Sequence, residues 1–422
     1  MPRSTLFAFA SAVLALQLPA VAQERQHPDV IERAFTAGHG DGTLTAAEAA
    51  LDAHLRGSPR DEDARFTLAI VRFLRTGERL SQSLYRHGGF NTVALASMMT
   101  GLGGVNQGVA ANPDPQPITH EQFEAIIRAW LDDVAAVERT LADVRADGVK
   151  VRARLGLTRF DLNADGVATE DEELWRLFRI VQDAFRPNRQ TAAEFVIAFD
   201  RGDAEWLRGY CRICMAFGEL LLAYDTRDLF ERAGHVFFPA NVTPHEYLKG
   251  PRRQFDMGTG VDVSDVIAFV HLLSFDVKDA ARLETARTHL LAAVAHSRAM
   301  WRYFDTETDN DREWIPNPRQ TAAIPGARVD DDMREAWLLG LDEAEALLEG
   351  RRLLRFWRGD GSRGINVRRV FAEPRRFDLV LWVQGSAAGP YLEEGEFTAD
   401  GTWNRMVRAF EGQVFRHAWW FN

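Results

Sequence analysis

The sequence predicts a mainly helical protein with a smaller α+β part at its C-terminal end. Apolar residues recur at three-and-four spacing through most of the chain up to residue 356, which is typical of helices buried on one face. Residues 357–422 instead carry short apolar runs separated by Gly and Pro, a pattern typical of strands. Hydrophobic residues make up 46% of the chain and charged residues 26%, so the composition is that of an ordinary globular protein.

The N-terminal segment has the pattern of a secretory signal peptide. Arg3 supplies a positive charge, an apolar stretch follows from Leu6 to Leu18, and Ala20-Val21-Ala22 fits the small-x-small cleavage rule. We therefore expect cleavage after Ala22 and an exported protein, periplasmic or secreted, that begins at Gln23. No other run of about 18 apolar residues follows, so no membrane span is expected in the mature chain.

The charge balance is acidic, with a formal net charge of -11 at pH 7. Nucleic acids and anionic membranes both require a basic surface, so we expect neither as a partner. An acidic surface attracts divalent cations instead.

Helical segments account for most of the chain after the signal. Apolar spacing places them at 44–55, 63–85, 119–147, 171–185, 203–223, 262–274, 279–304 and 331–356. Thr119 and Gln122 stand where the third segment begins and have the spacing of a capping box. Apolar and basic residues alternate over 149–157, which indicates a strand, and further strands are expected at 367–371, 377–383 and 413–421.

These elements divide the mature chain into four regions. They are an N-terminal helical region (23–147), a segment with a strand, an acidic loop and a helix (148–185), a second helical region (186–356) and an α+β region (357–422). Residues 88–117 are rich in Gly and Pro and predict a long loop. Loops of this length in compact proteins often serve as a lid or a binding edge.

The acidic loop of the second region runs from Asp161 to Glu172. Its sequence, DLNADGVATEDE, matches the pattern D-x-[DN]-x-[DN]-G-x5-E without a gap. It resembles the calcium-binding loop of the EF-hand family, and the resemblance is confined to these residues. The resemblance implies a calcium ion held by oxygen atoms of Asp161, Asn163, Asp165, Val167, Thr169 and Glu172.

The spacing of the loop suits the chemistry of calcium, which takes six to eight oxygen ligands at about 2.3–2.6 Å. Side chains at the first, third and fifth positions turn inward, and Gly166 permits a sharp turn with positive φ. The carbonyl oxygen of Val167 is a fourth ligand, and Thr169 contributes its hydroxyl or a bridging water. Glu172 closes the site with its carboxylate oxygens.

A turn followed by a helix cap is the alternative interpretation of this loop. Thr169-x-x-Glu172 is also a capping box, and Asp165-Gly166 is an ordinary turn pair. This alternative accounts for the second half of the loop, but it does not explain Asp161 and Asn163 in register. Calcium binding is therefore the preferred interpretation.

The chain has two cysteines, Cys211 and Cys214, which are one helical turn apart. We expect them to be small core residues. A redox pair or half of a zinc site is the alternative, but zinc requires two further ligands, and the sequence has no second C-x-x-C and no H-x-x-x-H.

A second acidic segment covers residues 305–313, where five carboxylates alternate: Asp305, Glu307, Asp309, Asp311 and Glu313. A solvated acidic loop is the expected structure. The alternatives are a second, irregular metal site and an acid pair for hydrolysis, with a sugar pocket floored by neighbouring aromatic residues, Trp301, Tyr303 and Trp314.

Three functional hypotheses follow. The first is an exported calcium-binding protein whose single ion is structural, because the strand-like lead-in and Ala168 at the eighth loop position disfavour a paired sensor. The second is a secreted hydrolase with residues 305–313 at its site. The third is a helical module that binds a protein partner through residues 88–117.

Overall fold

A computed structural model of the chain describes Ala34 and residues 43–89, 111–177, 188–250, 263–399 and 401–421. The predicted signal peptide (1–22) lies outside the described residues, as do 90–110 of the predicted long loop and 178–185 of the predicted helix at 171–185. The described structure is about 59% helical, with 14 helices and few strands. The prediction of a mainly α fold is therefore confirmed.

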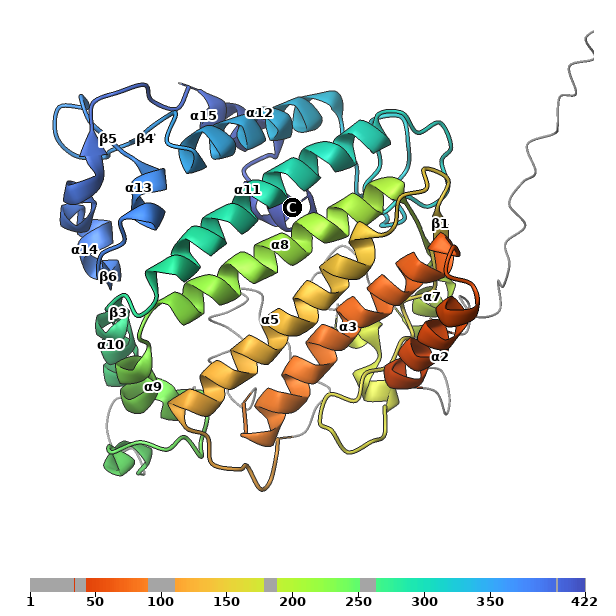
Figure 1. The fold of residues 1–422 in the computed structure, drawn as a ribbon, viewed down its shortest axis with the longest axis horizontal. Helices are drawn as coiled ribbons and strands as arrows, with labels where there is room; N and C mark the ends of the chain where they lie inside the picture. The colour runs from red at the N-terminus through yellow and green to blue at the C-terminus, as the bar shows by residue number, and fades with distance from the viewer. Residues whose placement is uncertain are drawn as a thin grey trace, which may run out of the picture.

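Four long helices lie side by side (Figure 1): α3 (Glu62–Arg86), α5 (His120–Ala142), α8 (Arg201–Ala223) and α11 (Ala280–Phe304). They alternate in direction, as contacts at one end of the row show. The carboxylate of Glu62, at the start of α3, accepts the backbone N–H of Arg145, just after α5, at 2.6 Å. Gly202, at the start of α8, lies against the ring of Phe304 at the end of α11. Two further helices flank the row, α2 (Leu44–Gly57) beside α3 and α12 (Asp331–Leu348) beside α11.

Side-chain caps fix where the long helices begin. The hydroxyl of Thr119 accepts the N–H of Gln122 at 3.2 Å, and the side chain of Gln122 accepts the N–H of Thr119 at 2.8 Å, so the predicted capping box is confirmed. Two helices end earlier than predicted, α5 at Ala142 instead of 147 and α12 at Leu348 instead of 356.

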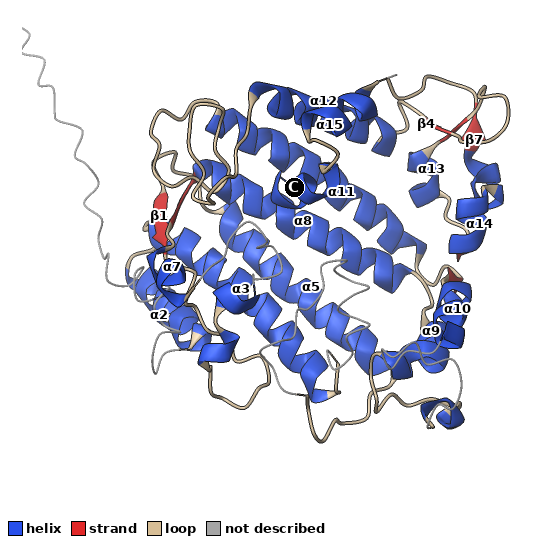
Figure 2. Ribbon diagram, turned by 180° about the vertical axis from the view of Figure 1, so that it is seen from behind, coloured by secondary structure: helices blue, strands red, loops and turns tan. Residues whose placement is uncertain are grey.

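The strands are short and lie at the edges of the helical body (Figure 2). The predicted strand at 149–157 is β1 (Lys150–Ala153), and it pairs antiparallel with β2 (Ile197–Asp200), so that Lys150 lies opposite Asp200. β3 (Ser274–Phe275) pairs with β6 (Phe377–Asp378). β5 (Gly364–Ile365) lies between β4 (Leu354–Arg355) and β7 (Leu392–Glu393). The remaining helices are α6 (Leu174–Leu177), α7 (Arg189–Glu194), α9 (Arg227–Ala233), α10 (Val263–Leu272), α13 (Val367–Ala372), α14 (Leu379–Gln384), α15 (Thr402–Ala409) and α16 (Val414–Phe421).

The three strands predicted in the C-terminal region are wrong in whole or in part. Residues 367–371 lie in α13 and 413–421 in α16, and only the first two residues of 377–383 form a strand before α14 begins. Asn366 and Asp378 cap α13 and α14 by accepting the backbone N–H of the third helical residue. Short apolar runs do not distinguish a strand from a helix, and these caps favour the helix.

The three largest of the five apolar clusters among the described residues join the main helices. The first joins α3, α5 and α8 with the two strands β1 and β2. The second joins α11, α12 and the C-terminal helix α16 around buried aromatic residues, including Trp301 and Phe421. The third lies between α2 and α3 and includes Phe160, Leu162 and Leu174, which flank or belong to the acidic loop 161–172.

Close approach of α5 and α8 depends on Gly218. A Cβ atom at this position would lie 2.4 Å from Cδ2 of Leu131, which is buried on α5. We predict that Gly218→Ala lowers the free energy of unfolding by about 1–3 kcal/mol because the core must shift to admit the methyl group. Urea denaturation measures this change.

Gly77 of α3 is the matched control, since a Cβ atom there meets nothing within 4 Å. Gly77→Ala should stabilise the protein by about 0.5–1 kcal/mol through helix propensity. Equal effects of the two substitutions would contradict this description of the α5–α8 contact.

Candidate metal centre

The loop 161–172 curls around the carboxylate of Asp161. Oδ1 of Asp161 accepts the N–H of Asp165, and Oδ2 accepts the N–H of Gly166, both at 3.1 Å. Oδ1 of Asp165 in turn accepts the N–H of Val167 at 2.8 Å. The predicted positive φ at Gly166 is present (+83°), and Ala164 also has a positive φ of 61°. Two left-handed residues in so short a stretch produce the tight curl.

Glu172 closes the loop from its far end. Its carboxylate is buried, with Oε1 accepting the N–H of Leu162 at 2.8 Å and Oε2 accepting the N–H of Thr169 at 2.9 Å. The hydroxyl of Thr169 also donates to Oε2. Each carboxylate oxygen has two lone pairs, so Oε2 is fully used by these bonds and Oε1 keeps one lone pair for a cation. The cap interpretation accounts for the contacts with Thr169 but does not include the contact with Leu162.

Helix α3 anchors the start of the loop. Oε1 of Glu78, which is 4% exposed, accepts the N–H of Asp161 at 3.0 Å. The side chains of Gln82 and Ser81 donate to the carbonyl oxygens of Asp161 and Leu162. These three bonds attach the start of the loop to α3.

The predicted ligands differ in their exposure. Asp161 and Asn163 are half-buried, Glu172 is buried, and the other three predicted ligands, Asp165, Val167 and Thr169, are exposed. The loop contains five acidic residues and no basic ones. Two of these acids are neutralised in ion pairs, Glu170 with Arg159 and Arg189, and Asp171 with Arg176.

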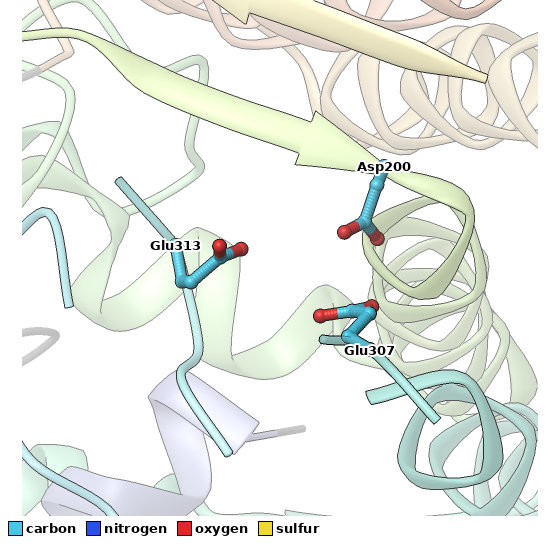
Figure 3. A group of neighbouring side chains, drawn as sticks. All are labelled: Asp200, Glu307 and Glu313. Atoms are coloured by element: carbon cyan, nitrogen blue, oxygen red, sulfur yellow. The ribbon is translucent and has the colours of Figure 1, made fainter. Parts of the chain in front are cut away.

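A second group of carboxylates, which the sequence alone did not assemble, lies at the start of α8. Oxygen atoms of Asp200, Glu307 and Glu313 all lie within 4.8 Å of one another, and Figure 3 shows the three side chains pointing toward a common centre. Among the described residues, the carboxylates of the loop 161–172 do not form such a close group. We call Asp200, Glu307 and Glu313 the acidic cluster.

Burial keeps protons on the acidic cluster. Burial, and next the charge of Asp200, raises the pKa of Glu307 to about 9. Burial is also the main reason that the pKa of Glu313 rises to about 7 and that the pKa of Asp200 is raised. Glu307 and Glu313 are therefore partly neutral at physiological pH, so the cluster reduces its own repulsion by holding protons.

The other three acids of 305–313 point elsewhere and form ion pairs. Asp305 pairs with Arg334, Asp309 with Lys150, and Asp311 with Arg152. The expectation of a solvated acidic loop thus holds for part of this segment, while Glu307 and Glu313 turn inward. The partner that sequence analysis missed is Asp200, the residue that caps α8 through the N–H of Gly202.

The aromatic residues near this segment are packed into the protein. Trp301 is 1% exposed and contacts the rings of Phe304 and Phe421. The guanidinium group of Arg201 lies over the ring of Tyr303, 4.9 Å from the ring centre. Trp301 is therefore not available as the floor of a sugar pocket.

The two cysteines lie in the core, as expected, and both are free thiols on α8. Burial raises the pKa of Cys214 to about 12, and burial also raises the pKa of Cys211. A thiol that resists ionisation is a poor nucleophile and a poor metal ligand, so this arrangement favours a packing role.

Comparison of the chain with models of protein families, with curated proteins and with solved structures gives no match. Within the described ranges, no helix has both the length and the apolar character needed to cross a membrane.

The raised pKa values give the acidic cluster a defined pH dependence. In the folded state Glu307 and Glu313 hold protons that they lose in the unfolded state, so their stabilising effect is complete below pH 4.5 and disappears as the pH rises through about 7 and 9. We predict that Glu307→Gln, measured with a chelator present, is more stable than the unsubstituted chain at pH 8.5 by at least about 1 kcal/mol, the equivalent of one pKa unit. At pH 5 the difference should be small.

Urea denaturation at both pH values measures this effect, and exposed Glu394→Gln is the control. A loss of stability at pH 8.5 on removing the Glu307 charge would contradict the raised pKa.

Proposed function

We propose that the chain is an exported calcium-binding protein with one EF-hand-type site at residues 161–172, and that its calcium is structural. The observation that carries the proposal is the closed loop. Asp161 receives the backbone N–H groups of the curl, while Glu172 bonds to Leu162 near its start. Both residues stand at the ligand positions of the motif, and calcium binding would require their oxygen atoms, which do not form a close group in the described structure, to move inward around the ion.

A structural role agrees with how the loop is attached. Leu162 lies in the apolar cluster between α2 and α3, and Glu78 of α3 accepts the N–H of Asp161. A calcium ion would neutralise the loop carboxylates and hold this attachment by mass action. Outside the cytosol a weak site, with a dissociation constant of about 10⁻⁴–10⁻³ M, is sufficient.

The hydrolase hypothesis has one observation in its favour, the raised pKa values of Glu307 and Glu313. Carboxyl groups with shifted pKa values occur at catalytic sites, but buried carboxyl groups with a purely structural role show the same pKa shifts. The interaction-module hypothesis rests on residues 88–117, of which 90–110 lie outside the described residues.

We expect one calcium ion to bind each chain and to stabilise its folded state. We predict that about 10 mM calcium raises the free energy of unfolding by about 1–3 kcal/mol, as expected for a dissociation constant of about 10⁻⁴–10⁻³ M. Asp161→Asn should abolish both this gain and the calorimetric signal of binding, because it removes a ligand charge and keeps the side-chain volume.

Asp171→Asn is the matched control, since Asp171 is an exposed acid of the same loop that does not occupy a ligand position. It should keep most of the gain. If Asp161→Asn binds calcium as well as the control does, the proposed site is wrong.

A further inference from the structure

Helix α10 exposes an apolar stripe of the kind that helices normally bury. The stripe consists of residues at the spacing i, i+3, i+4 and i+7, which share one face of the helix: Val263, Val266, Ile267 and Val270. These four side chains are 37–57% exposed, and α10 contains no buried residue. Another side of α10 attaches it to the protein, where Phe269 packs edge-on against Phe237 with 5.7 Å between ring centres.

Helix α14 lies beside α10 and also exposes apolar residues. Trp382 turns inward and stacks on the ring of Tyr391, while Val380, Leu381 and Val383 are 46–70% exposed. The strand pair of β3, which follows α10, and β6, which precedes α14, joins the two helices. Both views place them at the same edge of the molecule (Figures 1 and 2). We call the seven exposed residues of α10 and α14 the apolar edge, and an exposed group of this size marks an interaction site.

Arginine residues border the apolar edge. Residues 351–376 contain nine arginines and two acids, a formal charge of +7 in a chain whose net charge is -11. Arg358 lies at the end of α14, because a Cβ atom on Gly385 would be 3.3 Å from its Cδ atom. Arg375 lies just before β6, at the other end of α14. Arg358 and Arg375 are both exposed, and neither forms an ion pair with another of the described residues.

A bilayer with anionic lipids suits this surface better than another macromolecule does. Aliphatic side chains enter the boundary between headgroups and acyl chains, and arginine binds lipid phosphates through two parallel hydrogen bonds. Trp357, next to Arg358, is 52% exposed, and tryptophan is enriched at membrane interfaces. A nucleic acid would contact the arginines but would leave the aliphatic residues in water. A symmetric dimer across this edge would bring the arginines of the two copies close together, where like charges repel.

We propose that the apolar edge, together with Arg358 and Arg375, binds the surface of membranes that contain anionic lipids. The expectation that such membranes are not partners rests on the net charge of the whole chain, which does not describe residues 351–376. Binding at this edge requires neither a membrane-spanning helix nor calcium at 161–172.

Flotation of residues 23–422 with phospholipid vesicles tests this proposal. Residues 1–22 are omitted because a signal peptide would itself bind lipid, and a chelator prevents calcium from bridging acidic residues and lipid phosphates. Vesicles of phosphatidylglycerol and phosphatidylcholine in equal parts should bind the chain at least tenfold more tightly than vesicles of phosphatidylcholine alone.

The arginines are tested by Arg358→Gln combined with Arg375→Gln. This variant should bind the anionic vesicles about twentyfold more weakly, since one arginine near an anionic surface contributes about fivefold. Arg302→Gln is the control, because Arg302 is exposed without an ion pair to any described residue and lies at the end of α11 that is remote from β3.

The apolar edge is tested by Leu381→Asp, which should weaken binding to the anionic vesicles at least tenfold. Leu339→Asp is the matched control at a 39% exposed position of α12, and Val383→Asp replaces Leu381→Asp if circular dichroism shows that the latter does not fold. Equal binding to both kinds of vesicle, binding to neither, or unchanged binding of the edge variant would each overturn the proposal. A dimer in light scattering that Leu381→Asp dissociates would instead assign the edge to a second copy, and duplex DNA that displaces the vesicles would assign the arginines to nucleic acid.

Discussion

Close packing of α8 between α5 and α11 is the constraint on which the rest of the structure depends. Gly218 admits Leu131 of α5, and Gly202 admits the ring of Phe304 at the end of α11. Because α8 is held on both sides, its first residues cannot turn toward solvent. Asp200 and Asp203 are therefore retained inside the protein, and Asp200 joins the acidic cluster.

The carboxylates of the loop 161–172 and those of the acidic cluster lie in different environments. In the loop 161–172, the carboxylates of Asp161 and Asp165 accept backbone N–H groups close to solvent. In the acidic cluster, burial raises pKa values, so protons neutralise Glu307 and Glu313. A cation at the cluster would have to displace these protons.

Sequence periodicity was sufficient for the long helices because each carries several turns of apolar spacing and a side-chain cap. The loop pattern predicted a positive φ at Gly166, and the spacing of Thr119 and Gln122 predicted a capping box. Both features are present. Periodicity failed where the runs were short: α13, α14 and α16 were predicted as strands, since a few apolar residues do not define a period. The acidic cluster could not be predicted, because Asp200 meets Glu307 and Glu313 only through the packing of α8 and α11. Three of the five acids of 305–313 form ion pairs outside the acidic cluster, and no pattern within the segment marks the two acids that turn inward.

The most direct test of the central claim is a crystal structure determined after soaking in calcium, with anomalous differences used to locate the ion. The predicted result is one anomalous peak enclosed by residues 161–172, with oxygen atoms of Asp161, Asp165 and Glu172 among six to eight ligands at about 2.3–2.6 Å. A peak at Asp200, Glu307 and Glu313 with an empty loop, or no peak at millimolar calcium, would contradict the claim.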